Sequence, residues 1–333
     1  MMKHIVETVE SLQHCESPAQ EWQTLVSLKQ RLQPFTNVEQ FPLDEIVEHD
    51  FLRGDHDKFD ADEDPFPAAR ITAVFQNSTS LNQFVCYIFN RRFGWSESQV
   101  NRGSRHRHEE NANFKAKINE LLDQFLSWFH HQEMNIPLAE SFLHCMAKSH
   151  NKPVVRNQTL ISVMEWLKRC VPLHPTEEQY DAVKSVLLTA LADIWSAVRS
   201  SCASRLGPVL DQFSFGHLQD FFNSLVQVCL NPGTSWQAKE GAVMGMSSVI
   251  RRFQWVSVVS DDPEAVFDDN TSPQTKYFLK FGQEQLSAIP QFISGQMHHV
   301  AFSLLAHPQL SIRENAIKMY SSYITKCEFN VSP

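Results

Sequence analysis

Clustered carboxylates are the residues of this sequence whose types and spacing come closest to metal-binding chemistry. Asp60, Asp62 and Asp64 match the spacing of the first three ligands of an EF-hand calcium loop. That loop would place Pro65 where its sharp turn requires glycine, and Ile71 where a bidentate glutamate belongs. Because both demanding positions fail, we expect no metal site here. The acidic loop at 55–64 is either solvated or recruits a basic segment of a partner.

A second acidic cluster consists of Asp261, Asp262, Glu264, Asp268 and Asp269. Helical enzymes that bind diphosphates hold magnesium with a D-D-x-x-D pattern, and neither aspartate pair of this cluster has an aspartate at the fifth position. The cluster is either a solvated loop or a candidate partner-binding site. Clustered carboxylates steer basic segments of other proteins and raise their association rates, which would suit the second role.

The sequence lacks the common catalytic and nucleotide-binding motifs. It contains no G-x-x-x-x-G-K-[ST], G-x-G-x-x-G, H-E-x-x-H or G-x-S-x-G. Histidines are paired at His130-His131 and His298-His299. Adjacent residues of a helix point about 100° apart, so each pair supplies at most one ligand to a site. We therefore expect no enzyme activity and no catalytic, cofactor-binding or metal-binding residues.

Four basic residues recur at a regular spacing, and each follows a small or branched residue: Arg156, Arg199, Lys239 and Arg313. They are 43, 40 and 74 positions apart, and the last interval contains a proline-bearing acidic insertion at 254–284. A period of about 40 residues is typical of helical repeats. The sequence therefore predicts that one two-helix unit is repeated along the chain.

The clearest unit is predicted to have helices at 176–191 and 193–206. Thr176 and Gln179 have the spacing of a capping box, and Gly207-Pro208 is expected to end the second helix. In the next unit, glycines one turn apart at 241 and 245 would allow a neighbouring helix to approach closely. The whole chain has only 10 glycines, which suits a mostly helical protein.

Upstream of the repeats, the pattern predicts helices at 3–15, from Ser17-Pro18 to Pro34, at 42–52, at 81–89 and at 112–131, with an exposed loop at 93–111. We divide the chain into an N-terminal helical segment with an acidic loop, residues 1–64, and a repeat region, residues 65–333. The sequence stops without an evident polar capping helix, so the repeats are expected to be able to continue in a longer protein.

Three runs resemble the second helix of HEAT repeats, in which a V-R-x-x-A core follows an Asp or Pro turn: Trp195–Ala203, Trp236–Val243 and Leu310–Ile317. Asp193 keeps the turn aspartate, and Lys239 replaces the arginine in one copy. The resemblance to the HEAT/armadillo family implies an all-α fold, an α-solenoid in which antiparallel helix pairs form a right-handed superhelix. Most members are scaffolds or adaptors, so it also implies a non-enzymatic protein–protein interaction scaffold.

The same resemblance leaves a second function open, because HEAT-like DNA glycosylases line a concave face with basic and aromatic residues. Trp195 and Trp236 occupy equivalent repeat positions, and Arg199 and Lys239 lie one turn further on. These four are candidate partner-binding residues. The tryptophans also fit a core stripe, and in the family the repeated basic residue commonly lies along the seam between repeats.

Composition favours protein partners over nucleic acid. With 29 basic and 38 acidic residues the net charge is −9, so no global field attracts nucleic acid. Seven cysteines without a C-x-x-C motif suit a reduced compartment. No apolar run approaches the ~18 residues of a membrane-spanning helix, and the first residues do not form a signal peptide. We expect a soluble cytoplasmic or nuclear protein, not inserted in a membrane, whose protein partners include ones with basic segments.

Overall fold

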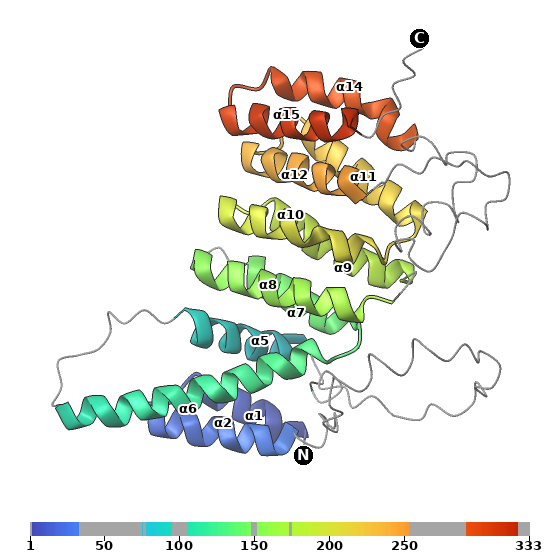
Figure 1. Cartoon of the computed structure of the whole chain (residues 1–333). Coiled ribbons are helices and arrows are strands. Elements are labelled where there is room, and N and C mark those ends of the chain that lie inside the picture. Colours follow the sequence, from blue (N-terminus) through green and yellow to red (C-terminus); the bar gives the residue numbers. More distant parts are fainter. Residues whose placement is uncertain are drawn as a thin grey trace, which may run out of the picture. The chain divides into compact units, whose positions relative to one another are not determined.

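The computed structural model describes residues 2–32, 75, 78–94, 105–147, 152–172, 175–252 and 291–325. All regular secondary structure in these ranges is helical, which confirms the all-α class (Figure 1). The predicted helix at 42–52, the acidic loop at 55–64, the boundary at 64/65 and the insertion at 254–284 lie outside the described residues. The chain forms two compact units, Met1–Ser141 and Phe142–Pro333. No helix in the described ranges combines the length and apolar character needed to cross a membrane.

Four helices make up most of the described part of the first unit: α1 (Met2–Leu12), α2 (Pro18–Leu32), α5 (Ser78–Phe93) and α6 (Arg105–His130). Helix α2 packs against α1 and α6, and α5 packs against both α1 and α6. Phe84 lies at the centre of the core, with its ring centroid 5.4 Å from that of Phe125 and 5.8 Å from that of Phe129. The buried carboxylate of Glu21 accepts hydrogen bonds from Tyr87 and Arg91.

Two predictions for this unit have different outcomes. The apolar run at 81–89 is part of helix α5, as predicted. The prediction of a loop throughout 93–111 is wrong at its end, because α6 already begins at Arg105. No glycine or proline stands between positions 105 and 130, so nothing stops the helix from extending beyond the apolar stripe that marks it in the sequence.

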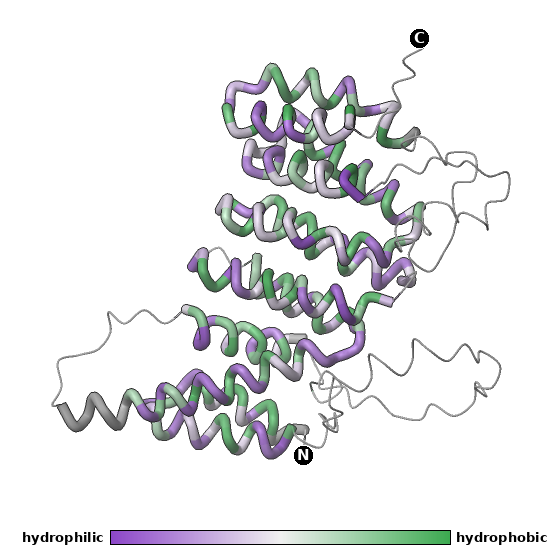
Figure 2. Tube along the Cα trace, in the orientation of Figure 1, coloured by the Kyte–Doolittle hydropathy of each residue, from purple (hydrophilic) through white to green (hydrophobic). Residues whose placement is uncertain are grey.

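The second unit is built largely from helix pairs. Helix α7 (Ile136–Ala147) crosses the division between the units, and seven helices follow it: α8 (Pro153–Cys170), α9 (Glu177–Leu191), α10 (Ser196–Leu210), α11 (Phe215–Leu230), α12 (Trp236–Arg252), α14 (Gln291–Leu305) and α15 (Leu310–Ile324). We call the two members of each pair its first and second helix. The second helices pack in the order α8, α10, α12, α15, and the first helices α9, α11 and α14 pack in that order (Figure 1). Apolar and polar residues alternate along each helix, as expected where one face is buried (Figure 2).

Helices α10 and α12 run parallel to one another. Near its start, α10 contacts α12 through Arg199 and Glu240. Halfway along α10, the Ala203 carbonyl accepts a hydrogen bond from the Ser248 hydroxyl of α12, at 2.7 Å. At the end, Arg252 of α12 pairs with Asp211, which caps α10. Equivalent ends of α10 and α12 therefore lie beside each other. The start of α8 joins theirs through Arg156 and Asp193, and the turn before α15 joins through His307, which lies near Lys239, so the starts of the four helices form one edge of the unit.

The helix ends follow the sequence in one case and depart from it in another. Thr176 and Gln179 form the predicted capping box, with backbone–side-chain distances of 3.1 and 3.3 Å. Gly207-Pro208 does not end α10, which continues to Leu210 with Pro208 inside its last turn. Proline costs one hydrogen bond there, and the complete burial of the side chains that follow, at positions 209 and 210, offsets it.

Helices α9 and α12 approach closely at Gly241, as the glycine spacing predicted. A Cβ atom on Gly241 would lie 1.7 Å from the carbonyl oxygen of Leu191, the last residue of α9. A Cβ atom on Gly245 would meet only side-chain ends, the nearest at 2.9 Å. The α9–α12 distance thus depends on the missing side chain at position 241.

Candidate functional site

The repeated basic residues occupy one structural position. Arg156, Arg199, Lys239 and Arg313 are each the fourth residue of a second helix, in α8, α10, α12 and α15 respectively. Because these helices start along one edge of the second unit, the four side chains lie one turn in from that edge. We call this the N-terminal edge; it comprises the first turns of the four helices and the turns that precede them.

Two of the arginines lie in the seams between neighbouring second helices. Arg156 Nη2 lies 3.0 Å from Asp193 Oδ1, in the turn before α10. Asp193 Oδ1 also accepts from the Trp195 N–H at 2.8 Å, and the Asp193 carbonyl accepts from Arg199 Nη1 at 2.6 Å. Arg199 Nε in turn donates to Glu240 Oε2 at 2.9 Å. These bonds form a continuous ladder from α8 to α12.

Burial sets the electrostatics of this ladder. It raises the pKa of Asp193 above its ordinary value, against the lowering effects of the Trp195 N–H, Arg156 and Arg199. The Arg199 side chain is only 1% exposed, and that of Glu240 is 9% exposed. A guanidinium so enclosed cannot reach a ligand. Arg199, a candidate partner-binding residue from its place in the repeat, instead joins α10 to α12.

The two candidate tryptophans lie at the surface of the N-terminal edge. Trp195 is the N-cap residue of α10 and is 47% exposed, and Trp236 is the first residue of α12 and is 40% exposed. The alternative that they belong to a core stripe is therefore wrong. The Trp236 ring centroid lies 5.6 Å from Arg199 Cζ, so the buried guanidinium makes a cation–π contact with this ring.

Other exposed apolar residues accompany the tryptophans. Seven large apolar side chains are exposed in the described part of the chain, and five of them belong to the N-terminal edge: Val154, Ile194, Trp195, Trp236 and Leu310. Val154, Ile194 and Leu310 were not among the residues that the sequence predicted for partner binding. Their positions could have indicated them, because each of the five stands within five positions before a repeated basic residue.

The remaining candidates differ in what the structure says of them. Lys239 lies on the N-terminal edge and is partly exposed. The acidic cluster, Asp261, Asp262, Glu264, Asp268 and Asp269, lies outside the described residues, so its role stays a prediction. Within the described ranges, no group of three or more histidine, cysteine or acidic side chains could hold a metal ion.

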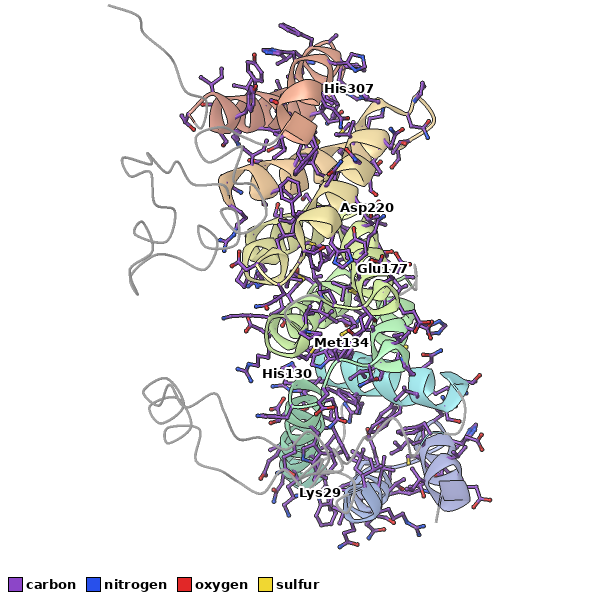
Figure 3. The ribbon with its side chains drawn as sticks, turned by 90° about the vertical axis from the view of Figure 1, so that its right-hand side faces the viewer. Lys29, His130, Met134, Glu177, Asp220 and His307 are labelled. Atoms are coloured by element: carbon purple, nitrogen blue, oxygen red, sulfur yellow. The ribbon has the colours of Figure 1, made fainter. Side chains whose placement is uncertain are left out.

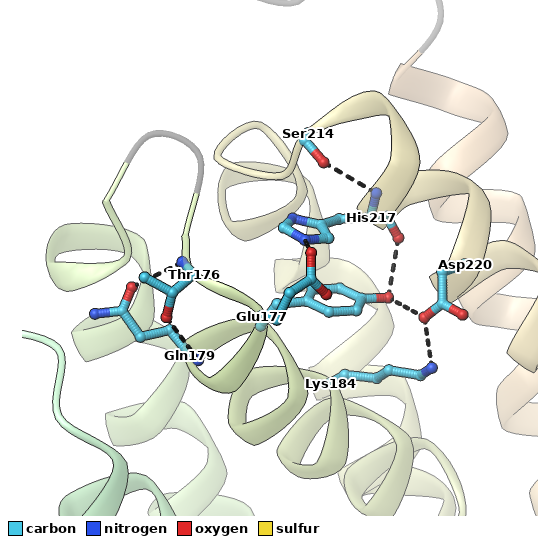
Figure 4. A network of polar contacts seen from close by, with 8 residues as sticks. Thr176, Glu177, Gln179, Lys184, Ser214, His217 and Asp220 are labelled. Atoms are coloured by element: carbon cyan, nitrogen blue, oxygen red, sulfur yellow. Dashed lines mark hydrogen bonds and ion pairs between the residues drawn. The ribbon is translucent and has the colours of Figure 1, made fainter.

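A second polar network joins the first helices α9 and α11 (Figure 4). The Tyr180 hydroxyl donates to Asp220 Oδ2 at 2.6 Å, and Lys184 Nζ donates to the same oxygen at 2.5 Å. The His217 ring stacks on Tyr180 with centroids 4.1 Å apart, and its Nε2 lies 3.1 Å from Glu177 Oε1. Burial first, and then the Asp220 carboxylate, raise the pKa of Tyr180.

These residue types occur in acid–base catalysis, but here they link two helices. Burial acts to raise the pKa of Asp220, and the hydrogen bonds from Lys184 and Tyr180 outweigh it, so the pKa is lowered and the carboxylate stays charged. The tyrosine, whose pKa is raised, stays protonated and donates to that carboxylate. Because the network spans α9 and α11, it fixes the register of these two helices, as the arginine ladder does for α8, α10 and α12.

Comparisons with known proteins do not assign a family to this chain. The sequence matches no protein-family model, and no curated protein matches it.

Proposed function

We propose that this protein is a non-enzymatic scaffold or adaptor that binds other proteins, and that its second unit is an α-solenoid of HEAT-like helix pairs. The second helices, each with a basic residue at its fourth position, support the repeat assignment. The exposure of five large apolar side chains along the N-terminal edge carries the functional proposal.

Large exposed apolar side chains that lie close together mark interaction sites, whereas single ones are ordinary. Tryptophan is the residue most enriched among those that dominate binding energy, because it buries a large area with few rotatable bonds. Trp195 and Trp236 start neighbouring helices, and the packing of α10 on α12 brings these starts together. A partner segment that crosses both helix starts would therefore cover two such side chains.

A protein partner suits this edge better than a nucleic acid. Nucleic-acid binding needs accessible cations that neutralise phosphates. Arg156 and Arg199 are 5% and 1% exposed and already pair with Asp193 and Glu240. The ladder thus pairs two of the four repeated cations of this edge, whereas five large apolar side chains remain at its surface.

Affinity capture from cell extract, with matched variants, tests the scaffold proposal. The edge variant Trp195→Ser/Trp236→Ser removes two exposed rings at the edge. The control Phe302→Ser/Ile317→Ser removes two side chains that are 67% and 57% exposed on α14 and α15, beyond their first turns. Helicity and melting temperature of both variants are measured first.

We expect the same proteins to be enriched by wild type and by the control, and to be lost from the edge variant. Equal enrichment by all three forms would contradict the proposal for this edge. Capture of nuclease-sensitive material that disappears with rising salt would favour the nucleic-acid alternative instead.

A further inference from the structure

The turn before α15 is built like the turn before α10, with one substitution that changes its charge. In the α10 turn, Asp193 stands six positions before Arg199; its side chain accepts from the N–H two residues on, and its carbonyl accepts from Arg199. In the α15 turn, His307, which is labelled in Figure 3, has the corresponding place. It stands six positions before Arg313. Its Nδ1 accepts from the N–H two residues on, at 3.1 Å, and its carbonyl accepts from Arg313 Nη1 at 2.8 Å.

His307 therefore occupies the place of the turn aspartate. At the earlier seam, Asp193 is the counter-ion of Arg156, the fourth residue of the preceding second helix. The residue equivalent to Arg156 at the later seam is Lys239 of α12, which packs against α15. Lys239 is close enough to His307 to act on its charge, so it has a histidine nearby where its counterpart has a carboxylate.

The charges around His307 are those expected for a turn without a carboxylate. The pKa of His307 lies below its usual range because burial, and then the nearby cations Lys239 and Arg313, disfavour a charged ring. Glu240, the residue after Lys239, pairs with Arg199 of the preceding second helix. The equivalent residue after Arg313 is Glu314, which is exposed. Among the described residues, no carboxylate forms an ion pair with Lys239.

Two exposed apolar residues lie one turn from these cations. Trp236 precedes Lys239 by three positions, and Leu310, 57% exposed, precedes Arg313 by three. Residues three apart share a helix face, so each apolar side chain and its cation lie on the same side of their helix. His307, whose Nδ1 accepts a hydrogen bond, keeps its proton on Nε2 and so adds a neutral N–H donor.

We propose that the seam between α12 and α15 binds an extended segment of another protein in which an Asp or Glu carboxylate stands beside large apolar side chains. The carboxylate supplies Lys239 with the counter-ion that Asp193 supplies to Arg156 in the earlier seam, and it lies beside His307. The apolar side chains of the segment cover Trp236 and Leu310. This assignment rests on the proposed scaffold function and specifies the chemistry of its partner.

Selection of a random-peptide phage library on the immobilised full chain tests this assignment. We expect the selected peptides to be enriched in an acidic residue next to aromatic or aliphatic ones. Lys239→Gln should weaken a selected peptide about tenfold, the effect of one lost charge-assisted contact. Lys168→Gln, which removes an equal charge from the exposed last turn of α8, should leave the affinity unchanged. Replacing the peptide's acid by its amide should cost the same tenfold with wild type and little with Lys239→Gln.

His307→Asp is the most stringent variant, because it gives Lys239 a counter-ion within the protein, as Asp193 does for Arg156. It should keep the backbone contact that Asp193 makes, keep the melting temperature, and reduce peptide affinity at least tenfold. Selected peptides without acidic residues, unchanged affinity in Lys239→Gln or His307→Asp, or a selection that yields no specific peptide would each overturn the assignment. Under each of these results, loss of captured proteins in Trp195→Ser/Trp236→Ser would still support the scaffold proposal, so the two proposals are judged separately.

Discussion

Gly241→Ala tests whether the close approach of α9 and α12 holds the second unit together. The added Cβ would lie 1.7 Å from the Leu191 carbonyl oxygen and 3.1 Å from Arg199 Cδ. Real Cβ atoms essentially never come within 3.0 Å of a neighbour, so the end of α9 must move away from α12 by more than an ångström. The obstacle is backbone at a helix end, which cannot turn aside as a side chain does.

The expected cost follows from two opposing effects. Alanine in place of glycine within a helix stabilises it by about 1 kcal/mol. Overpacking costs typically 1–3 kcal/mol and more where backbone must move, and separating the helices also disturbs the completely buried core around them. We therefore expect Gly241→Ala to lower the free energy of unfolding by about 2–4 kcal/mol.

Urea unfolding followed by circular dichroism measures this loss, and two other glycines provide controls. Gly295 of α14 has open space around its missing Cβ, so Gly295→Ala should stabilise the protein by about 0.5–1 kcal/mol. Gly245→Ala meets only the movable ends of leucine side chains and should fall between the two. If Gly241→Ala is as stable as Gly295→Ala, the helices do not approach as described.

Three further predictions concern the ladder, a helix cap and a buried thiol. Glu240→Gln leaves the Arg199 charge without its carboxylate in a buried site, and should lower the free energy of unfolding, measured in urea, by about 3–5 kcal/mol. The control Arg92→Gln, at an exposed ion pair, should lower it by less than about 1 kcal/mol. Equal losses in the two variants would contradict the buried ladder. Thr176→Ala removes the capping box and should cost about 1 kcal/mol, whereas an unchanged urea midpoint would show that the cap does not matter. Burial raises the pKa of the Cys202 thiol to about 12, so site-resolved mass spectrometry at pH 8 should show alkylation about a thousandfold slower than in urea, and rapid labelling of the native protein would refute its burial.

The sequence predicted local features of the fold well, because they are encoded within single helices. The capping box needs only the spacing of Thr176 and Gln179, and the basic residue at the fourth position of each second helix needs only a repeat of about 40 residues. Pro208 was misjudged because the burial that follows it depends on neighbouring helices. The same kind of tertiary information decides how far α6 extends beyond its apolar stripe.

The candidate site was predicted less completely, since exposure is a property of packing. Trp195 and Trp236 stand at the starts of their helices, and only the neighbouring helices decide whether a side chain there is covered. Trp195 and Trp236 could therefore not be separated from the core by spacing, and Arg199 could not be recognised as buried. Its partner Glu240 stands next to Lys239 in the sequence, but the pairing requires α10 and α12 to be side by side. The histidine at position 307 could be noticed only once its turn was seen to match that of Asp193.

Photo-crosslinking from the N-terminal edge tests the central proposal of a protein-binding edge most directly. Benzoylphenylalanine is placed at position 195, and for comparison at position 302, which is 67% exposed on α14 beyond its first turn. The scaffold proposal predicts discrete crosslinked protein adducts from position 195 after illumination in cells, and none of these adducts from position 302. Identical adducts from both positions, or adducts to nucleic acid alone from position 195, would contradict it.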